Sequence, residues 1–345
     1  MNHSTKTAML LSIALLAACG GGGSDPTPPD NVNAFPNVSP SAGDWYVYTS
    51  TVTPTLPTGA APSERTITRH YRVVNSDGSF TRTDIASTVN SLASRAYNTS
   101  GALVTYTSGT QLCTYAPAFR SGPPLTSVLA DSFTATSTES CAIQPSGAPT
   151  LTTLSANGSN QSTESRSIPL GTFSTFKYSQ TIVASSASGV TTTLETCWID
   201  RNTGRAVECT STYSTVPVGQ LVATASGSRI FRLEGYSFRG QTPVGAAVRR
   251  FSGNWKVNFA GSSIGDCGNL LIDINGQISG SCRFLTSAGV YGPSFAVTGT
   301  VGANGAATVS ATTGANMTGT FTSPESANGT WVNTGASGTW TAAHI

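Results

Sequence analysis

Histidine would have to act as the general base of a serine hydrolase, and this 345-residue chain has three histidines. His3 lies at the extreme N-terminus, and His344 is the penultimate residue, where we expect no group to hold it within hydrogen-bond reach. His70 lies beside Arg69 and Arg72 in an alternating stretch, which predicts a histidine on the surface of a strand. We expect no strand-to-helix nucleophile elbow and no H-E-x-x-H zinc motif, and therefore no catalytic residue.

Carboxylates could bind a metal ion or hydrolyse a glycosidic bond, and the chain has 16 of them. Glycoside hydrolysis needs two acids at a defined separation, which spacing along the chain does not show. Asp200, Asp266 and Asp273 are candidate calcium ligands, but no Asp-x-Asp-x-Asp-Gly spacing accompanies them. Asp77 and Asp200 are better interpreted as side chains that stabilise turns. The sequence thus predicts no metal site and no cofactor.

Cys19 differs from the other cysteines because it follows an apolar run, residues 7–18, that comes after the single charge of Lys6. The run is too short for a bilayer span of roughly 20 residues and is typical of a secretory signal. It ends in Leu16-Ala17-Ala18-Cys19, which resembles the lipobox of bacterial lipoproteins. The resemblance implies that residues 1–18 are removed and that diacylglycerol and a fatty acid such as palmitate are attached to Cys19. Three acyl chains would anchor the protein firmly to a membrane.

The residues after Cys19 predict a tether. Residues 19–43 contain the run Gly20–Gly23 and several prolines without apolar periodicity, which is typical of a linker that is flexible first and stiffer later. The glycine run follows no strand and opens no helix, so it is not expected to bind phosphate. In the lipoproteins that the lipobox resembles, a glycine rather than an aspartate after the cysteine implies sorting to the outer membrane, on either of its faces.

Six cysteines remain, and an even count in an exported chain predicts three disulfides. Cys197 and Cys209 are equidistant from a turn at residues 201–204, and Cys267 and Cys282 bracket the hairpin signal Asn275-Gly276. Directly opposed residues of paired strands are close enough for a disulfide. We therefore predict Cys197–Cys209 and Cys267–Cys282, and by elimination Cys113–Cys141.

The composition excludes nucleic acid as a partner, because only 10% of the residues are charged and the formal net charge is +2. β-branched residues are abundant, and residues 44–239 alternate with a period of two between turn signals, which predicts a β-rich first domain. The stretch 85–97 also has near-helical spacing, but its Ser, Thr and Asn content favours a strand.

A linker is predicted at residues 240–250, followed by a second domain at residues 251–345. Eight short strands are expected there, and Asn275-Gly276, Asn304-Gly305 and Asn328-Gly329 are expected turns. A closed antiparallel meander barrel is our first choice, because closure removes exposed strand edges, and an open sheet or sandwich is the second. The predicted strands are 254–259, 268–274, 277–285, 294–301, 306–312, 316–322, 329–333 and 338–342.

This C-terminal part resembles the small glycine- and threonine-rich β-barrels of bacterial surface lipoproteins of the transferrin-binding protein B type. The matching residues are Gly319-Thr320-Phe321, Gly329-Thr330-Trp331 and 337–342, in a region that covers under a third of the chain. The charged loops of an iron-protein receptor are missing, so we expect no transferrin-like partner.

The first domain is similar to periplasmic proteins of the LolA-like type, which are built on a curved half-barrel sheet. Residues 171–177 and Cys197-Trp198-Ile199-Asp200, with Gly204 and Val207, carry the similarity. It implies a curved sheet whose concave face could hold an apolar ligand.

The five tryptophans could stack on sugars or partners, but each lies in an alternating segment, so we expect them in cores. We therefore predict an all-β envelope lipoprotein at the outer membrane with a non-enzymatic binding, adhesive or structural role. A carrier or sensor of an apolar ligand is the alternative, and a hydrolase comes third. The expected partners are the membrane, through the lipid, and a protein or an apolar small molecule.

Overall fold

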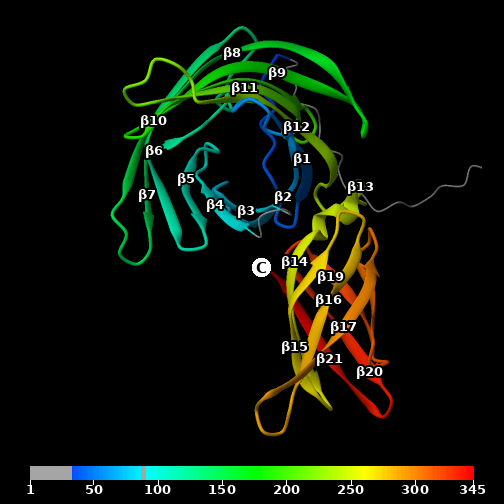
Figure 1. Cartoon of the computed structure of the whole chain (residues 1–345). Coiled ribbons are helices and arrows are strands. Elements are labelled where there is room, and N and C mark those ends of the chain that lie inside the picture. Colours follow the sequence, from blue (N-terminus) through cyan, green and yellow to red (C-terminus); the bar gives the residue numbers. More distant parts are fainter. Residues whose placement is uncertain (1–32, 87–90) are drawn as a thin grey trace, which may run out of the picture.

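The computed structural model describes residues 33–86 and 91–345 and shows an all-β protein made of two closed sheets (Figure 1). The predicted signal peptide and lipobox, with Cys19, lie outside the described residues. The first sheet contains β1 (Trp45–Leu56), β2 (Ser63–Val74), β3 (Phe80–Ala86), β4 (Ser91–Tyr97), β5 (Leu103–Ser108), β6 (Gln111–Phe119), β7 (Ser132–Ile143), β8 (Thr150–Ile168), β9 (Gly171–Ser186), β10 (Gly189–Asp200), β11 (Ala206–Pro217), β12 (Ala225–Ser237) and β13 (Val244–Gly245). The 3-10 helix η1 (Ala247–Phe251) leads to β14 (Gly253–Gly261), β15 (Ile264–Ile272), β16 (Gln277–Leu285), β17 (Tyr291–Val301), β18 (Ala306–Ala311), β19 (Asn316–Ser323), β20 (Ser326–Asn333) and β21 (Ala336–His344).

Strands β1 to β12 form an antiparallel meander that we call the first barrel. Each strand pairs with the next, and β12 returns to pair with β1 over most of their length, so the sheet closes. The sequence favoured a curved sheet of the half-barrel type. The sheet instead closes completely, and closure leaves no edge strand exposed. Within the stretch 85–97 the described residues lie in β3 and β4, which confirms the strand over the helix.

Strand β1 is buried on both faces near its start. Tyr46 and Tyr48 point into an aromatic cluster inside the first barrel, where Tyr71 and Leu233 also lie. Trp45 and Val47 point the other way. They pack there against Ala247 of η1, so the segment between the two sheets covers the outer face of β1.

Part of the expected tether is wrong. We assigned residues 19–43 to a linker, but residues 33–43 pack against the first barrel. The Phe35 side chain is only 7% exposed and contacts the ring of Phe176 edge-on. Its amide donates a hydrogen bond to the carbonyl of Ser127. Burial of the Phe35 ring explains why this segment packs against the barrel, because an aromatic side chain stabilises the fold by roughly 1.5–3 kcal/mol when it leaves water.

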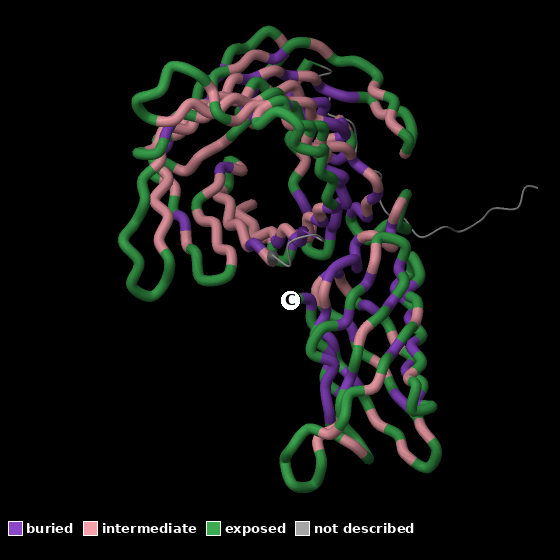
Figure 2. The backbone as a smooth tube through the Cα atoms, in the orientation of Figure 1, coloured by how far each residue is buried: buried purple, intermediate pink, exposed green. Residues whose placement is uncertain are grey.

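Strands β14 to β21 form the second barrel, an eight-stranded closed meander whose interior is filled by side chains. Each of the eight predicted strands overlaps one of these strands. Buried and exposed residues alternate along them, as the period of two requires (Figure 2). The closed barrel is thus confirmed over the open sheet and the sandwich.

The turn expected at Asn328-Gly329 is wrong, because both residues lie inside β20. Gly329 faces the barrel interior, where a β-carbon would lie 2.7 Å from the indole of Trp340. The glycine is needed to make room for a large ring rather than to allow a turn. The chain instead turns between β19 and β20, around Glu325.

The cysteine pairs at bonding distance are the three that the sequence predicts: Cys113–Cys141, Cys197–Cys209 and Cys267–Cys282, with S–S distances of 2.04, 2.08 and 1.98 Å. The first two pairs join directly opposed residues of neighbouring strands. Each disulfide therefore joins two strands of one barrel, and none links the two barrels.

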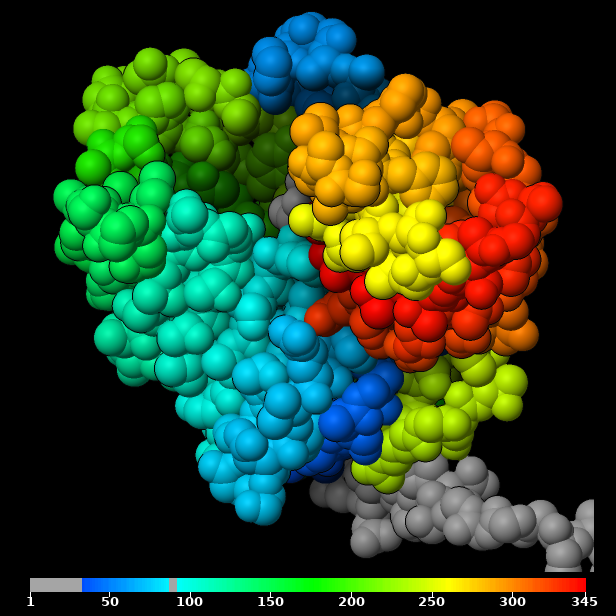
Figure 3. Space-filling view, turned by 90° about the horizontal axis from the view of Figure 1, so that it is seen from below, coloured from blue at the N-terminus to red at the C-terminus, as the bar shows by residue number. Residues whose placement is uncertain are grey.

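The two barrels lie side by side, with the second barrel against the wall that contains β1 to β3 (Figures 1 and 3). Arg250 of η1 connects them. Its guanidinium lies 4.5 Å from the ring centre of Trp45 and donates hydrogen bonds to the carbonyls of Ala247 and Ala303. Burial lowers the pKa of Arg250 to about 10, so the group is still charged at neutral pH.

Candidate functional site

A cavity of about 710 Å³ lies inside the first barrel. It is lined by strands on both sides of the β1–β12 junction and by residues 35–40 of the N-terminal segment. Almost half of the arginines of the chain line it, and they are Arg65, Arg69, Arg82, Arg95, Arg120, Arg205 and Arg229. Wall residues around the cavity are mostly of intermediate burial, in contrast to the filled second barrel (Figure 2).

The pairing of β2, β3 and β4 brings three of these arginines together. Residues two apart on a strand share a face, so Arg65, Arg69 and Tyr71 of β2 all face inward. Arg69 is paired with Asp84 of β3, and Arg82 of β3 is paired with Arg95 of β4. The sheet register therefore places two like charges directly opposite each other.

Asp84 neutralises part of this cluster. Its carboxylate accepts hydrogen bonds from Arg82 Nε at 2.8 Å and Nη2 at 3.1 Å, and from Arg95 Nε at 2.7 Å. Burial raises the pKa of Asp84, but the guanidinium groups of Arg82, Arg69 and Arg95 outweigh that effect and hold the pKa below its usual value. Asp84 is therefore ionised at neutral pH and is shared between two cations.

Three of the cavity arginines without a carboxylate partner, Arg69, Arg120 and Arg205, lie on aromatic rings. The guanidinium carbon of Arg69 is 5.0 Å from the ring centre of Tyr48 and 4.7 Å from that of Phe231. Arg205 lies 5.0 Å from the ring of Tyr71. Stacking of this kind stabilises a cation and holds its plane fixed, while the N–H edge stays free to bind another group.

Arg120 and Arg205 are also held by backbone carbonyls. Arg120 donates to the carbonyls of Pro123 and Ser100, and Arg205 donates to those of Gly204 and Val38. In the described part of the chain, neither of them nor Arg69 has a carboxylate within 4.0 Å. These cations are positioned without being neutralised.

The electrostatic effect of the arginines is visible at Tyr71, whose ring is buried in the aromatic cluster. Burial raises the pKa of the Tyr71 hydroxyl, yet Arg205, Arg82 and Arg69 together lower it below the ordinary value. A fully buried phenol has a raised pKa unless positive charge surrounds it. Tyr71 therefore lies in a positive local potential, whereas at Tyr97 and Tyr178, which also line the cavity, burial outweighs the arginines and raises the pKa.

Glu195 of β10 lines the opposite side of the cavity. Its carboxyl accepts a hydrogen bond from Gln180 Nε2 at 2.7 Å, and burial raises its pKa. A second hollow of about 810 Å³ begins at the same residue and runs over the hydroxyl-bearing side chains of β8 to β12. That hollow is lined by only one arginine, Arg229, so it has no excess of positive charge.

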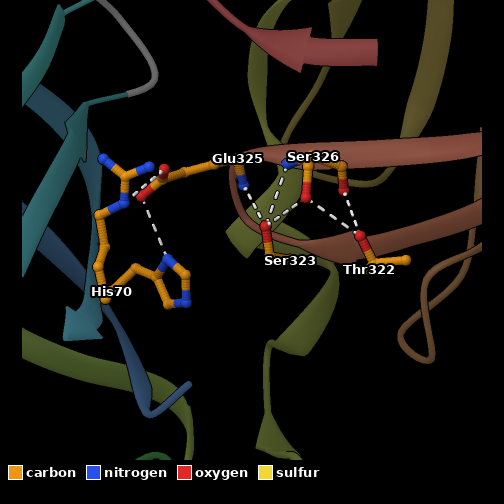
Figure 4. Close-up of polar contacts among 6 residues, drawn as sticks. His70, Thr322, Ser323, Glu325 and Ser326 are labelled. Atoms are coloured by element: carbon orange, nitrogen blue, oxygen red, sulfur yellow. Dashed lines mark hydrogen bonds and ion pairs between the residues drawn. The ribbon is translucent and has the colours of Figure 1, made fainter. Parts of the chain in front are cut away.

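His70 is not an exposed strand residue as the sequence predicted, because it lies at the contact between the barrels. Its Nδ1 is 3.2 Å from the carboxylate of Glu325, which extends from the turn before β20 toward β2 (Figure 4). Arg72 Nε lies 3.2 Å from the other oxygen of Glu325. The side chain of His70 is 12% exposed, and it joins the two barrels.

The expectation for His344 is wrong. The residue is 4% exposed, its Nε2 lies 3.3 Å from the carbonyl oxygen of Ser252, and its ring meets Trp255 edge-on. Strand β21 extends to His344 and closes the barrel against β14, which buries the penultimate residue. Its partners are a carbonyl and an indole, and neither is a nucleophile.

One G-x-S-x-G spacing does occur, at residues 261–265. It spans the turn between β14 and β15, where the chain continues as a strand rather than a helix. Because a nucleophile elbow needs a strand-to-helix turn, this match has no catalytic geometry.

The four aspartates considered from the sequence have separate local roles. Asp77 and Asp200 stabilise turns as expected, through hydrogen bonds from Ser79 and Thr203. Asp273 accepts hydrogen bonds from two amides of the β15–β16 turn, and Asp266 pairs with Arg283 at 3.0 Å. Asp200, Asp266 and Asp273 are thus not brought together as a calcium site.

In residues 33–86 and 91–345, two groups of three side chains have the composition and spacing to bind a metal ion. Each group contains two disulfide cysteines, whose sulfurs are already bonded to each other. No helix in this part of the chain is long and apolar enough to span a membrane.

All five tryptophans are at most 7% exposed, as the core interpretation predicts. Two of them carry cations on their rings: Arg166 and Lys177 on Trp198, and Arg250 on Trp45.

Sequence reasoning missed the arginine cavity. The signal was present in β2, where Arg65, Ile67, Arg69 and Tyr71 alternate with residues of the other face. An alternating strand does not by itself show which face its arginines take, because they lie outside a filled barrel but can line the interior of a hollow one.

No protein-family model and no curated protein sequence matches the chain. Among solved structures, it is similar to the hypothetical lipoprotein YmcC from Escherichia coli (K12), with 12% sequence identity and a TM-score of 0.29. The match covers 54% of this chain and 83% of that chain. A TM-score of this size does not establish a shared fold, so we transfer neither fold nor function from it.

Proposed function

We propose that the protein is a lipid-anchored binding protein of the bacterial cell envelope, attached through Cys19 and holding a small ligand inside the first barrel. The observation that carries the proposal is the 710 Å³ cavity with its fixed, un-neutralised guanidinium groups. Ligand cavities typically measure about 300–1,000 Å³ and contain a few convergent polar groups.

Export is supported by the sequence and by the cysteines. The lipobox Leu16-Ala17-Ala18-Cys19 supports acylation, and Gly20 supports the outer membrane as the destination. The six later cysteines are all paired, and structural disulfides persist outside the cytoplasm.

The arginines of the cavity wall favour a polar or charged ligand over the apolar ligand suggested by the sequence. A carrier of a purely apolar ligand would need an apolar wall, and Arg69, Arg120 and Arg205 would then be buried against hydrocarbon without a partner. Burial of an uncompensated charge costs several kcal/mol. We therefore favour a binding protein for a polar or charged ligand over the apolar carrier.

The anchor is tested by labelling cells with radioactive palmitate. We expect label and membrane fractionation for the wild-type chain and for a Ser24→Ala control, and neither for Cys19→Ser. Globomycin should cause the precursor to accumulate. Gly20→Asp should shift the protein from the outer to the inner membrane fraction. Unchanged labelling of Cys19→Ser would exclude the anchor.

Ligand uptake is tested on residues 20–345, exported behind a cleavable signal so that the disulfides form without a lipid. The described fold begins at residue 33, so this form contains it whole. The probes are the fluorescent aromatic anion 1-anilinonaphthalene-8-sulfonate and the neutral N-phenyl-1-naphthylamine. We expect saturable 1:1 binding of at least one of them.

Ile67→Trp should abolish this binding, because Ile67 lines the cavity and the larger ring would fill it. Val73→Trp is the matched control, since Val73 lies on the same strand and is 50% exposed. If Ile67→Trp fails to fold, Leu103→Trp blocks the cavity from β5. Absence of binding by both probes, or equal binding in the blocked variants, would exclude the cavity as a binding site.

A further inference from the structure

We propose that the ligand of the first barrel carries phosphate groups, which the guanidinium groups of the cavity bind. This inference rests on the proposed function, since it names the chemical class of ligand for the same cavity. Its argument uses the charge of the wall, the fixed geometry of Arg69, and the aromatic surface beside it.

The charge of the cavity wall is strongly unbalanced. Seven arginines line it against three carboxylates, those of Asp77, Asp84 and Glu195, which leaves an excess of four positive charges. The whole chain has a formal net charge of only +2, so the excess is a local property of the cavity. Water and salt would reach these groups, but the enclosing wall strengthens their interaction with a bound anion.

Phosphate matches this wall better than a carboxylate does. A phosphate monoester carries about −1.5 to −2 charges and three acceptor oxygens, so two phosphate groups would balance the excess. A single carboxylate would balance one charge of the four. Planar guanidinium groups bind phosphate oxygens through two parallel hydrogen bonds, which favours arginine over lysine at such sites. No lysine lines the cavity.

Arg69 is the residue best placed to bind first. Its guanidinium lies against both Tyr48 and Phe231, which fixes its plane. Its Nε is buried and has no hydrogen-bond partner among the described residues. Because this atom is closed to solvent, a phosphate would be bound by the terminal nitrogens of Arg69, and hydrogen bonds to charged groups contribute about 1.5–3 kcal/mol. Arg205, whose guanidinium lies over the ring of Tyr71, also has a buried Nε without a partner.

The rest of the ligand would lie on aromatic surface. Phe80, Tyr97 and Phe119 line the cavity next to the cluster around Asp84, and the rings of Phe80 and Tyr97 are stacked with their centres 4.7 Å apart. Phosphate could therefore come from a soluble phosphate compound or from the headgroup of a lipid. The two sources share the group that the arginines recognise.

The experiment measures binding to residues 20–345 by calorimetry with three probes: inorganic pyrophosphate, dodecyl phosphate below its micellar concentration, and the uncharged dodecyl maltoside. We expect at least one phosphate probe to bind and the maltoside to bind at least tenfold more weakly. Tight binding of pyrophosphate would indicate a soluble ligand, whereas binding of dodecyl phosphate alone would indicate a lipid headgroup.

Arg69→Gln should weaken phosphate binding about tenfold or more, because hydrogen bonds to charged groups contribute roughly 1.5–3 kcal/mol. Arg72→Gln is the matched control, since Arg72 lies on the same strand and pairs with Glu325 outside the cavity. Its affinity should equal that of the wild type. If Arg69→Gln does not fold, Arg205→Gln replaces it.

Equal affinity for dodecyl maltoside and dodecyl phosphate would overturn the inference, as would unchanged phosphate affinity in a folded Arg69→Gln. Binding of N-phenyl-1-naphthylamine with no binding of either phosphate would also overturn it, while the proposed function would stand. Failure of every probe would remove both.

Discussion

Replacement of Asp84 by asparagine tests whether the cavity wall depends on one shared carboxylate. The asparagine would keep the shape of the side chain and lose its charge. Arg82 and Arg95 would then face each other across paired strands with no anion between them. We therefore expect Asp84→Asn to destabilise the first barrel.

The magnitude follows from the burial of the three groups. Side chains of Arg82, Asp84 and Arg95 are 11%, 14% and 28% exposed, so the contacts are weakly screened by solvent. Removal of one partner from a buried ion pair costs about 3–5 kcal/mol. The asparagine oxygen can still accept one hydrogen bond, so we expect the lower end, about 3 kcal/mol. In a unit of roughly 200 residues this lowers the unfolding temperature by about 10 °C.

Differential scanning calorimetry of residues 20–345 at pH 7 measures the change. The Glu64→Gln control removes an exposed carboxylate of β2 and should alter stability by less than about 0.5 kcal/mol. The lowered pKa of Asp84 also fixes how its contribution to stability changes with pH. Because the pKa of Asp84 is lowered in the folded protein, its contribution is full above the unfolded value of about 4 and is lost as the pH falls through the folded value. A wild-type stability in Asp84→Asn at pH 7 would refute this reasoning.

Two further predictions concern the second barrel and its contact with the first. Glu325→Gln should cost about 1 kcal/mol at pH 7, since it removes a contact with His70 and a pair with the half-exposed Arg72. Burial raises the pKa of Glu325, but the hydrogen bond from His70 and nearby Arg72 lower it overall. The difference in urea titrations should therefore be full above the unfolded value of about 4.3 and disappear as the pH falls through the lower folded value. Gly329→Ala should cost about 2 kcal/mol in thermal unfolding, because the new methyl group would overlap a backbone oxygen of β19 and the Trp340 indole, whereas Gly268→Ala, with nothing within 4 Å, should not. A stable Gly329→Ala variant, or a Glu325→Gln effect that persists at low pH, would contradict these assignments.

Sequence patterns predicted the strands correctly wherever one face of a strand is apolar and buried and the other is exposed to solvent. The eight strands of the second barrel and the turns at Asn275-Gly276 and Asn304-Gly305 follow from period-two alternation and turn residues. Two of the cysteine pairs follow as well, because residues symmetric about a hairpin turn are opposed across it, and Cys113–Cys141 then follows by elimination. At Asn328-Gly329 the same rule failed, since the glycine serves a neighbouring indole that only the closed barrel brings near.

Tertiary structure alone decided the candidate site. Whether an alternating arginine faces solvent or a cavity depends on whether the sheet closes around empty space, and closure through β1 and β12 joins residues at least 170 positions apart. The chain determined by itself that it forms strands, where most of them turn in the second barrel, and which cysteines pair across a hairpin, because these depend on near neighbours in sequence. The arginine-lined interior of the first barrel, the burial of Phe35 and the contact of His70 with Glu325 depend on distant segments meeting, so no local pattern contains them.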